Sequence, residues 1–181
     1  MNAPNFISFS RLLLVPLIVW LLLRGHYFFA FWTFVAAGLS DAVDGFLARR
    51  MNSQSVIGGF LDPLADKALL MSVYVTLGYQ GMIATWLVIL VVFRDLVIIG
   101  GALLFQTLNG PLRPHPLMIS KINTAAQIVL AALVLGGLAF EMRQMGIERI
   151  LSFIVGGTTL LSGAAYVIKW GRHASAMETK P

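Results

Sequence analysis

The chain has 181 residues, of which 58% are hydrophobic and 12% are charged, and its formal net charge is +5. This composition excludes an ordinary soluble domain, in which about a quarter of the residues are charged. The absence of cysteine excludes disulfide and thiolate chemistry. Apolar runs recur from end to end, so we expect an all-α integral membrane protein with one transmembrane domain over residues 1–181.

Six apolar stretches are each long enough to cross a bilayer as a helix. They are predicted at about residues 7–23, 27–48, 58–79, 82–107, 118–140 and 147–169. A short amphipathic segment near the membrane surface is expected at the N-terminus, and a polar tail from about residue 170. The first stretch lacks a small-residue cleavage site, so we expect a retained helix and not a signal peptide.

The basic residues divide unequally between the two sides that six spans define. One side receives Arg11, Arg49, Arg50, Arg113, Lys121, Lys169, Arg172 and Lys180. The other receives Arg24, Arg143 and Arg149. The positive-inside rule therefore places both termini on the cytoplasmic side of the membrane. Membrane orientation and anionic lipid, and not nucleic acid, explain the positive net charge.

Acidic residues are concentrated between the second and third stretches. Residues 41–66 hold four of the eight acidic side chains, namely Asp41, Asp44, Asp62 and Asp66. A carboxylate costs a few kcal/mol or more in hydrocarbon, so four of them need a compensating partner. Spacings of three and four place each pair on one face of a helix. Two such faces can converge on one or two hard cations, Mg²⁺ or Mn²⁺. A transit site in a metal-ion transporter is the alternative from another functional class.

Small residues and one arginine accompany these acids. Gly45, Gly58 and Gly59 leave room for a bulky ligand, because glycine lacks a Cβ atom. The small side chain of Ala48 keeps the same helix face shallow one turn later. Arg49 follows one turn after the first acidic pair and is placed to pair with an anionic group held by the metal. Together these residues indicate a diphosphate substrate, although each small residue alone also suits helix packing.

The acidic stretch reads as one pattern, D-x2-D-G-x2-A-R-x8-G-x3-D-x3-D, from Asp41 to Asp66. It resembles the signature of the CDP-alcohol phosphotransferase family in every defined position. The segment PNFISFSR at 4–11 is similar to the family's Pro-Asn-x-x-Thr-x-x-Arg segment, with Ser8 where threonine is usual. The resemblance implies six transmembrane helices, a homodimer, and transfer of a phosphatidyl group from CDP-diacylglycerol to an alcohol with release of CMP.

The same resemblance implies roles for individual residues. The metal ligands would be Asp41, Asp44, Asp62 and Asp66. Asp66 would also be the general base that accepts the proton of the attacking hydroxyl. The CDP-lipid would be bound by Asn5, Gly45, Ala48, Arg49 and Gly58.

The acceptor alcohol is read from residues 93–127. The runs FRDLVIIGGALL (93–104) and PLRPHPLMISKINTAAQ (111–127) resemble cardiolipin synthases, which use phosphatidylglycerol, more than phosphatidylglycerophosphate synthases, which use glycerol 3-phosphate. The second acceptor stays the alternative. Candidate acceptor-binding residues are Arg94, Arg113, Lys121 and Asn123.

Each basic candidate has a second interpretation. Lys121 also suits a snorkelling anchor at the membrane surface. Arg94 also suits a structural ion pair together with Asp95. Arg113 also suits a loop residue that only adds positive charge to the inner side.

Overall fold

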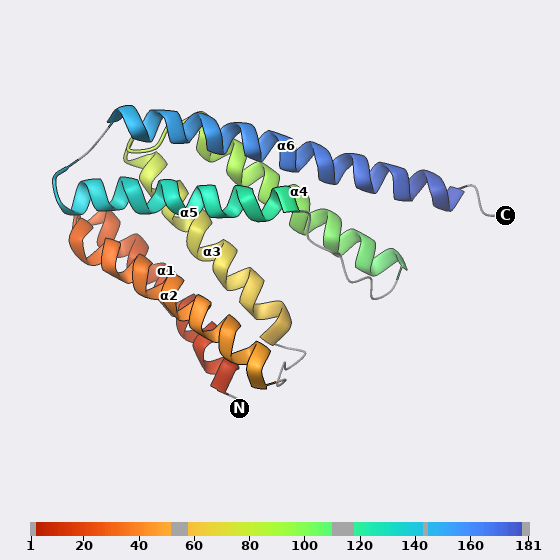
Figure 1. Cartoon of the computed structure of the whole chain (residues 1–181), viewed down its shortest axis with the longest axis horizontal. Helices are drawn as coiled ribbons and strands as arrows, with labels where there is room; N and C mark the ends of the chain where they lie inside the picture. The colour runs from red at the N-terminus through yellow and green to blue at the C-terminus, as the bar shows by residue number, and fades with distance from the viewer. Residues whose placement is uncertain (1–2, 52–57, 110–117, 143–144, 179–181) are drawn as a thin grey trace.

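Six α-helices make up the described part of the chain in this computed structural model (Figure 1). The backbone is described for residues 3–51, 58–109, 118–142 and 145–178, and side chains for 12–40, 67–101, 118–142 and 146–168. The helices are α1 (Ala3–Leu23), α2 (Tyr27–Met51), α3 (Gly58–Tyr79), α4 (Thr85–Asn109), α5 (Met118–Ala139) and α6 (Met145–Glu178). The all-α prediction is confirmed, and each helix coincides with one predicted stretch.

Two glycines end helices where the chain reverses. Gly25 has φ 74° and Gly81 has φ 71°, values in the left-handed region that other residues rarely adopt. After α1, the Gly25 amide donates to the Leu22 carbonyl (3.0 Å) and the next amide donates to the Leu21 carbonyl (2.9 Å). The same pair of bonds closes α3 at Gly81. These are Schellman caps, and they make the connections to α2 and α4 short.

Two helices are longer than the sequence predicted. The expected N-terminal surface segment is not a separate element, because α1 is one helix from Ala3 that contains Pro16 in its interior. At the other end α6 has 34 residues and continues to Glu178, through the tail expected from about residue 170. This tail has no proline before Pro181, and alanine, methionine and glutamate favour a helix.

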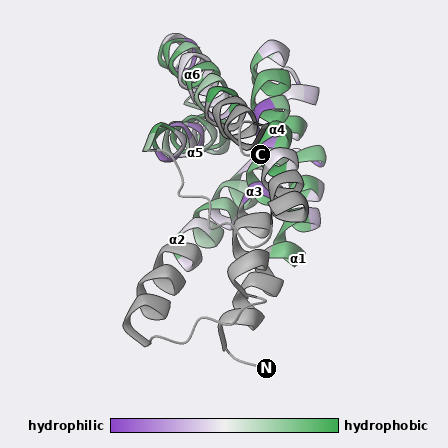
Figure 2. Ribbon diagram, turned by 90° about the vertical axis from the view of Figure 1, so that its right-hand side faces the viewer, coloured by the Kyte–Doolittle hydropathy of each residue, from purple (hydrophilic) through white to green (hydrophobic). Residues whose placement is uncertain are grey.

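The six helices pack around one apolar core. α3 packs beside α1, α2 packs beside both α1 and α5, and α6 packs against α4 and α5. The core includes Ile18, Leu22, Tyr74, Leu77, Leu87, Leu130 and Leu135. Figure 2 shows that the described parts of the helices consist mainly of hydrophobic residues. Side chains such as Phe29, Phe93 and Leu161 are more than 60% exposed, which suits contact with lipid.

Two segments are long and apolar enough to cross a bilayer, by length and composition. They are Met118–Ala139 and Gly146–Ile168, within the described residues. Residues 12–23 and 27–40 form shorter apolar segments. Six helices are therefore observed, and six transmembrane spans stay a prediction.

Candidate functional site

The acidic motif lies on two helices that meet at one end of the bundle. Asp41 and Asp44 belong to the last turns of α2, and Asp62 and Asp66 belong to the first half of α3. Figure 1 shows the end of α2, the start of α3 and the start of α1 at the same end of the molecule. The helical backbone keeps each pair on one face, as the spacing predicts. The side chains of all four lie outside the described residues, so their convergence stays a prediction.

The other predicted donor-binding residues also lie outside the described side chains. Asn5 belongs to α1, Gly45, Ala48 and Arg49 belong to α2, and Gly58 begins α3. Arg113 lies outside the described residues altogether. Among the side chains that are described, which do not include the four aspartates, no group of three or more acidic, histidine or cysteine residues gathers as a metal site.

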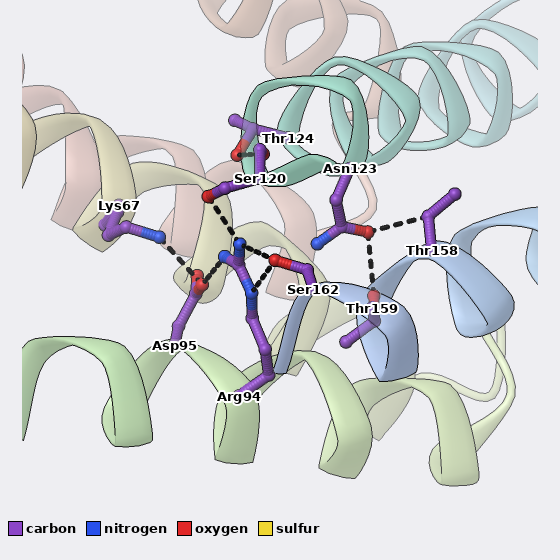
Figure 3. Close-up of polar contacts among 9 residues, drawn as sticks. All are labelled: Lys67, Arg94, Asp95, Ser120, Asn123, Thr124, Thr158, Thr159 and Ser162. Atoms are coloured by element: carbon purple, nitrogen blue, oxygen red, sulfur yellow. Dashed lines mark hydrogen bonds and ion pairs between the residues drawn. The ribbon is translucent and has the colours of Figure 1, made fainter. Parts of the chain in front are cut away.

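A cluster of charged side chains includes Lys67, which follows the last residue of the acidic motif on α3. Figure 3 shows this cluster. The Lys67 ammonium nitrogen lies 2.7 Å from Asp95 Oδ1, and Arg94 Nη1 lies 2.5 Å from the same oxygen. The side chains of Arg94 and Asp95 are each 2% exposed, whereas that of Lys67 is 27% exposed. Two cations therefore share one buried carboxylate, and one of these cations is partly accessible.

Two serines complete this cluster by accepting hydrogen bonds from Arg94. Arg94 Nη2 donates to Ser162 Oγ on α6 and to Ser120 Oγ on α5, both at 2.6 Å. Arg94 Nε also donates to Ser162 Oγ at 3.2 Å. The ion cluster, defined as Lys67, Arg94, Asp95, Ser120 and Ser162, therefore joins α3, α4, α5 and α6. These contacts favour the structural interpretation of Arg94 over acceptor binding.

Asn123 is part of a second polar contact between α5 and α6 (Figure 3). Its side chain is fully buried, and its Oδ1 accepts hydrogen bonds from Thr158 Oγ1 (2.8 Å) and Thr159 Oγ1 (2.9 Å). Asn123 Nδ2 has no partner among the described residues. The residue thus faces the interface between two helices. Lys121, in contrast, is exposed and is available to either role that the sequence suggests.

Sequence reasoning missed the partnership of Lys67 with Asp95. A signal for it was present, because a lysine and an aspartate within apolar helices are expected to pair. The serines carried no such signal, since serine is common in membrane helices as a packing residue.

Comparison with known proteins places the chain in a family. The sequence model of the CDP-alcohol phosphatidyltransferases matches residues 1–166. The chain is 38% identical over 189 residues to the chloroplastic CDP-diacylglycerol–glycerol-3-phosphate 3-phosphatidyltransferase 1 of Oryza sativa subsp. japonica, which covers 94% of this chain and 57% of that protein. It is 34% identical over 179 residues to the cardiolipin synthase (CMP-forming) of Homo sapiens, covering 90% and 60%.

A bacterial relative matches over nearly its whole length. The CDP-diacylglycerol–glycerol-3-phosphate 3-phosphatidyltransferase of Bacillus subtilis is 29% identical over 185 residues, covering 93% of this chain and 94% of that protein. Of the rice and human relatives, the chain spans less than two thirds. Because the family match extends over most of its length, the chain belongs to the CDP-alcohol phosphatidyltransferase family.

Proposed function

We propose that the chain transfers the phosphatidyl group of CDP-diacylglycerol to phosphatidylglycerol, forming cardiolipin and CMP. A hydroxyl oxygen of phosphatidylglycerol forms the new bond to the phosphatidyl phosphorus, the bond from that phosphorus to CMP breaks, and the hydroxyl proton is transferred to the enzyme. The family match over residues 1–166 supports the donor and the reaction type. The named relatives include both acceptor classes and therefore do not distinguish between the two acceptors.

The choice of phosphatidylglycerol as acceptor rests on one observation, namely that Arg94 is bound to residues of the protein itself. Glycerol 3-phosphate is a small dianion, and a site that binds it needs several cationic side chains around its phosphate. Arg94 is 3% exposed and donates to Asp95, Ser120 and Ser162. Asn123 is buried between α5 and α6. Two of the four candidate acceptor-binding residues, Arg94 and Asn123, are therefore engaged by other helices in the described structure, which favours phosphatidylglycerol with its single phosphodiester charge.

The donor set at the acidic motif fits a hard divalent cation. The sequence supplies four carboxylates from the adjoining ends of α2 and α3, and oxygen ligands of this kind suit Mg²⁺ or Mn²⁺. We propose that Asp41, Asp44, Asp62 and Asp66 hold two such ions. When bound, they supply positive charge against the diphosphate of the donor and the CMP that leaves.

The chain's own residues perform the remaining steps. Asn5, Gly45, Ala48, Arg49 and Gly58 bind and orient the CDP-lipid, with the Arg49 guanidinium against its phosphate oxygens. The Asp66 carboxylate accepts the proton of the attacking hydroxyl. Orientation of the two lipids supplies much of the acceleration, because it converts a bimolecular encounter into a step within one complex.

The setting of the enzyme is part of the proposal. It would be a homodimer in the bacterial cytoplasmic membrane or the mitochondrial inner membrane, with the acidic motif on the cytoplasmic or matrix side. The distribution of basic residues supports this orientation.

A second candidate is phosphatidylglycerophosphate synthase. It is favoured by the rice relative, at 38% identity, and by the B. subtilis relative, which this chain covers almost completely. The two candidates share the donor and the acidic motif. They differ only in the acceptor.

One experiment separates them. Purified protein in mixed micelles receives CDP-diacylglycerol and Mg²⁺ or Mn²⁺, with phosphatidylglycerol or glycerol 3-phosphate, and lipid products are identified by mass spectrometry. We expect cardiolipin and CMP from the first acceptor. Phosphatidylglycerophosphate as the only product would replace our proposal by the second candidate. Metal flux into proteoliposomes without any CDP-lipid, and no product, would indicate the transporter.

A further inference from the structure

A cavity of about 400 Å³ lies between α2, α3 and α5. Its walls are mainly apolar and include Phe34, Val35, Leu70 and Ala132, while its polar lining residues are Lys67, Thr124 and Gln127. Two other lining residues, Leu39 and Ile128, are 62% and 45% exposed. The cavity is therefore open to the apolar outer face of the bundle. A water molecule takes about 30 Å³, so the space admits a much larger molecule.

The lysine in this lining brings an excess of positive charge. Among the described side chains, Lys67 and Arg94 share Asp95 as their carboxylate, so the ion cluster contains two positive charges and one negative charge. Arg94 is buried, whereas Lys67 is 27% exposed and borders the cavity. An unbalanced charge in an apolar membrane domain needs a counter-ion. The accessible cation therefore marks a place for one negative charge at the cavity.

A glutamine in the same lining has unused hydrogen-bonding groups. Gln127 is 1% exposed, and neither Nε2 nor Oε1 of its amide has a partner among the described residues. Leaving such a group unsatisfied costs about 1–3 kcal/mol. Its backbone carbonyl accepts a hydrogen bond from Tyr74 (3.0 Å), and Tyr74 lies seven residues after Lys67 on α3. This contact places the Gln127 backbone further along α3 than Lys67.

We propose that this cavity binds the acceptor phospholipid. Its phosphodiester lies against the Lys67 ammonium, the Gln127 amide donates to an ester carbonyl, and an acyl chain lies along the apolar wall. This inference rests on the proposed function for the name of the lipid. The polar groups follow the order of a glycerophospholipid, from phosphate to esters to hydrocarbon, along the direction of α3.

The charge of the two lipid substrates indicates which of them binds in the cavity. The ion cluster offers an excess of one positive charge, which matches a phosphodiester. The diphosphate of the donor carries about two negative charges and has its own partners in the proposed metal site and Arg49. Asp95 is then a positioning residue, because it holds the Lys67 ammonium without neutralising the whole cluster.

Binding is tested without turnover. Thermal unfolding of the purified full chain is followed in a neutral detergent, with no CDP-lipid and no added metal, over a titration of phosphatidylglycerol. Phosphatidylcholine and glycerol 3-phosphate are the comparison ligands. We expect a concentration-dependent rise in Tm with phosphatidylglycerol, because a ligand that binds the folded state stabilises it. A smaller rise is expected with zwitterionic phosphatidylcholine and none with glycerol 3-phosphate.

Three variants locate the effect. Lys67→Met removes the charge and should raise the half-saturating phosphatidylglycerol concentration about tenfold, since a hydrogen bond to a charged group is worth a factor of that order. Gln127→Leu lies outside the ion cluster and should raise it several-fold. Arg24→Met is the matched control, because Arg24 is an exposed cation beyond α1 that does not line the cavity. It should leave the titration unchanged.

Each result has one meaning. Equal titrations for wild type, Lys67→Met and Gln127→Leu would overturn the inference, even if the enzyme makes cardiolipin. If the two variants bind CDP-diacylglycerol more weakly but bind phosphatidylglycerol as the wild type does, the inference would also be overturned. The cavity would then be a binding site for the donor lipid. If the variants weaken phosphatidylglycerol binding but the enzyme makes only phosphatidylglycerophosphate, the cavity stands and the proposed acceptor fails. In active protein, Lys67→Met should raise the KM for phosphatidylglycerol more than it lowers kcat.

Discussion

The acidic motif at 41–66 and the ion cluster of α3–α6 differ in how their charges are neutralised. The motif supplies four carboxylates from two helices, so it must obtain positive charge from outside. In the cluster, Arg94 and Lys67 share Asp95, and two serines accept hydrogen bonds from Nη2 and Nε of Arg94. The first arrangement is incomplete without a ligand, as a catalytic site should be. The second is mostly complete within the protein, as a helix clamp should be.

This contrast predicts that Asp66→Asn affects activity and not stability. General acid–base catalysis contributes about 10²–10⁴-fold, so turnover should fall by at least about 100-fold. Tm should not fall, because the substitution removes one of several like charges. The measurements are CMP release under saturating substrates and thermal unfolding of the same preparation. Near-normal turnover would remove Asp66 from the role of general base.

Asp95→Asn, in contrast, should strongly lower stability. It leaves two cations without their carboxylate, and breaking a buried ion pair costs about 3–5 kcal/mol. We expect that loss in the free energy of unfolding, measured by denaturant titration in mixed micelles. CDP-diacylglycerol binding to the fraction that stays folded should be near normal.

A double variant is the control for this effect. Arg94→Met with Asp95→Leu removes both members of the buried pair and should destabilise less than Asp95→Asn alone, because no unpaired buried guanidinium remains. Destabilisation that simply adds between the two positions would contradict a direct ion pair.

More of the acidic motif than of the ion cluster could be predicted from the sequence. Apolar length is a property of one segment, so all six helices could be located from the sequence, and the spacing of the aspartates is likewise local. The ion cluster depends on which helices become neighbours. Ser120 and Ser162 are 42 residues apart, and they meet Arg94 only after α4, α5 and α6 have packed together.

The same reason explains why Asn123 was predicted to bind the acceptor but is found in a contact between two helices. From the sequence it stood beside Lys121 in a short polar run, and both were candidates for acceptor binding. The helical rotation between positions 121 and 123 separates them, so that Lys121 is exposed and Asn123 is buried against α6. A pattern could not decide this, because it depends on where α6 lies.

A moderate loss is expected at the contact of Asn123 with α6. Asn123→Ala removes the acceptor of two threonine hydroxyls, and we expect a destabilisation of about 1–3 kcal/mol. Thr159→Val keeps the shape of the side chain and removes one bond, so it should cost about 1 kcal/mol. Thermal unfolding of both variants measures the two destabilisations, so that they can be compared. Equal effects would mean that Thr158 contributes little, since Thr158 also bonds to its own helix at 3.0 Å.

The smallest expected effects separate two adjacent glycines of α6. A Cβ atom at Gly156 would lie 2.8 and 2.9 Å from ring atoms of Trp86 on α4, whereas a Cβ atom at Gly157 meets nothing within 4 Å in the described structure. Gly156→Ala should therefore destabilise by about 1–2 kcal/mol through overpacking. Gly157→Ala should be neutral or stabilise by up to about 1 kcal/mol, because alanine favours the helix.

The glycine pair also tests whether the ion cluster depends on close packing of α4 and α6. Gly156 permits the approach of Trp86, and Arg94 and Ser162 lie on the same two helices, about two turns and nearly two turns further along. If Gly156→Ala separates the helices, it should weaken the contact of Arg94 with Ser162. Its effect should then shrink in a Ser162→Ala background, where that contact is already lost. Equal losses in both backgrounds would show that the ring of Trp86 moves aside and the helices do not.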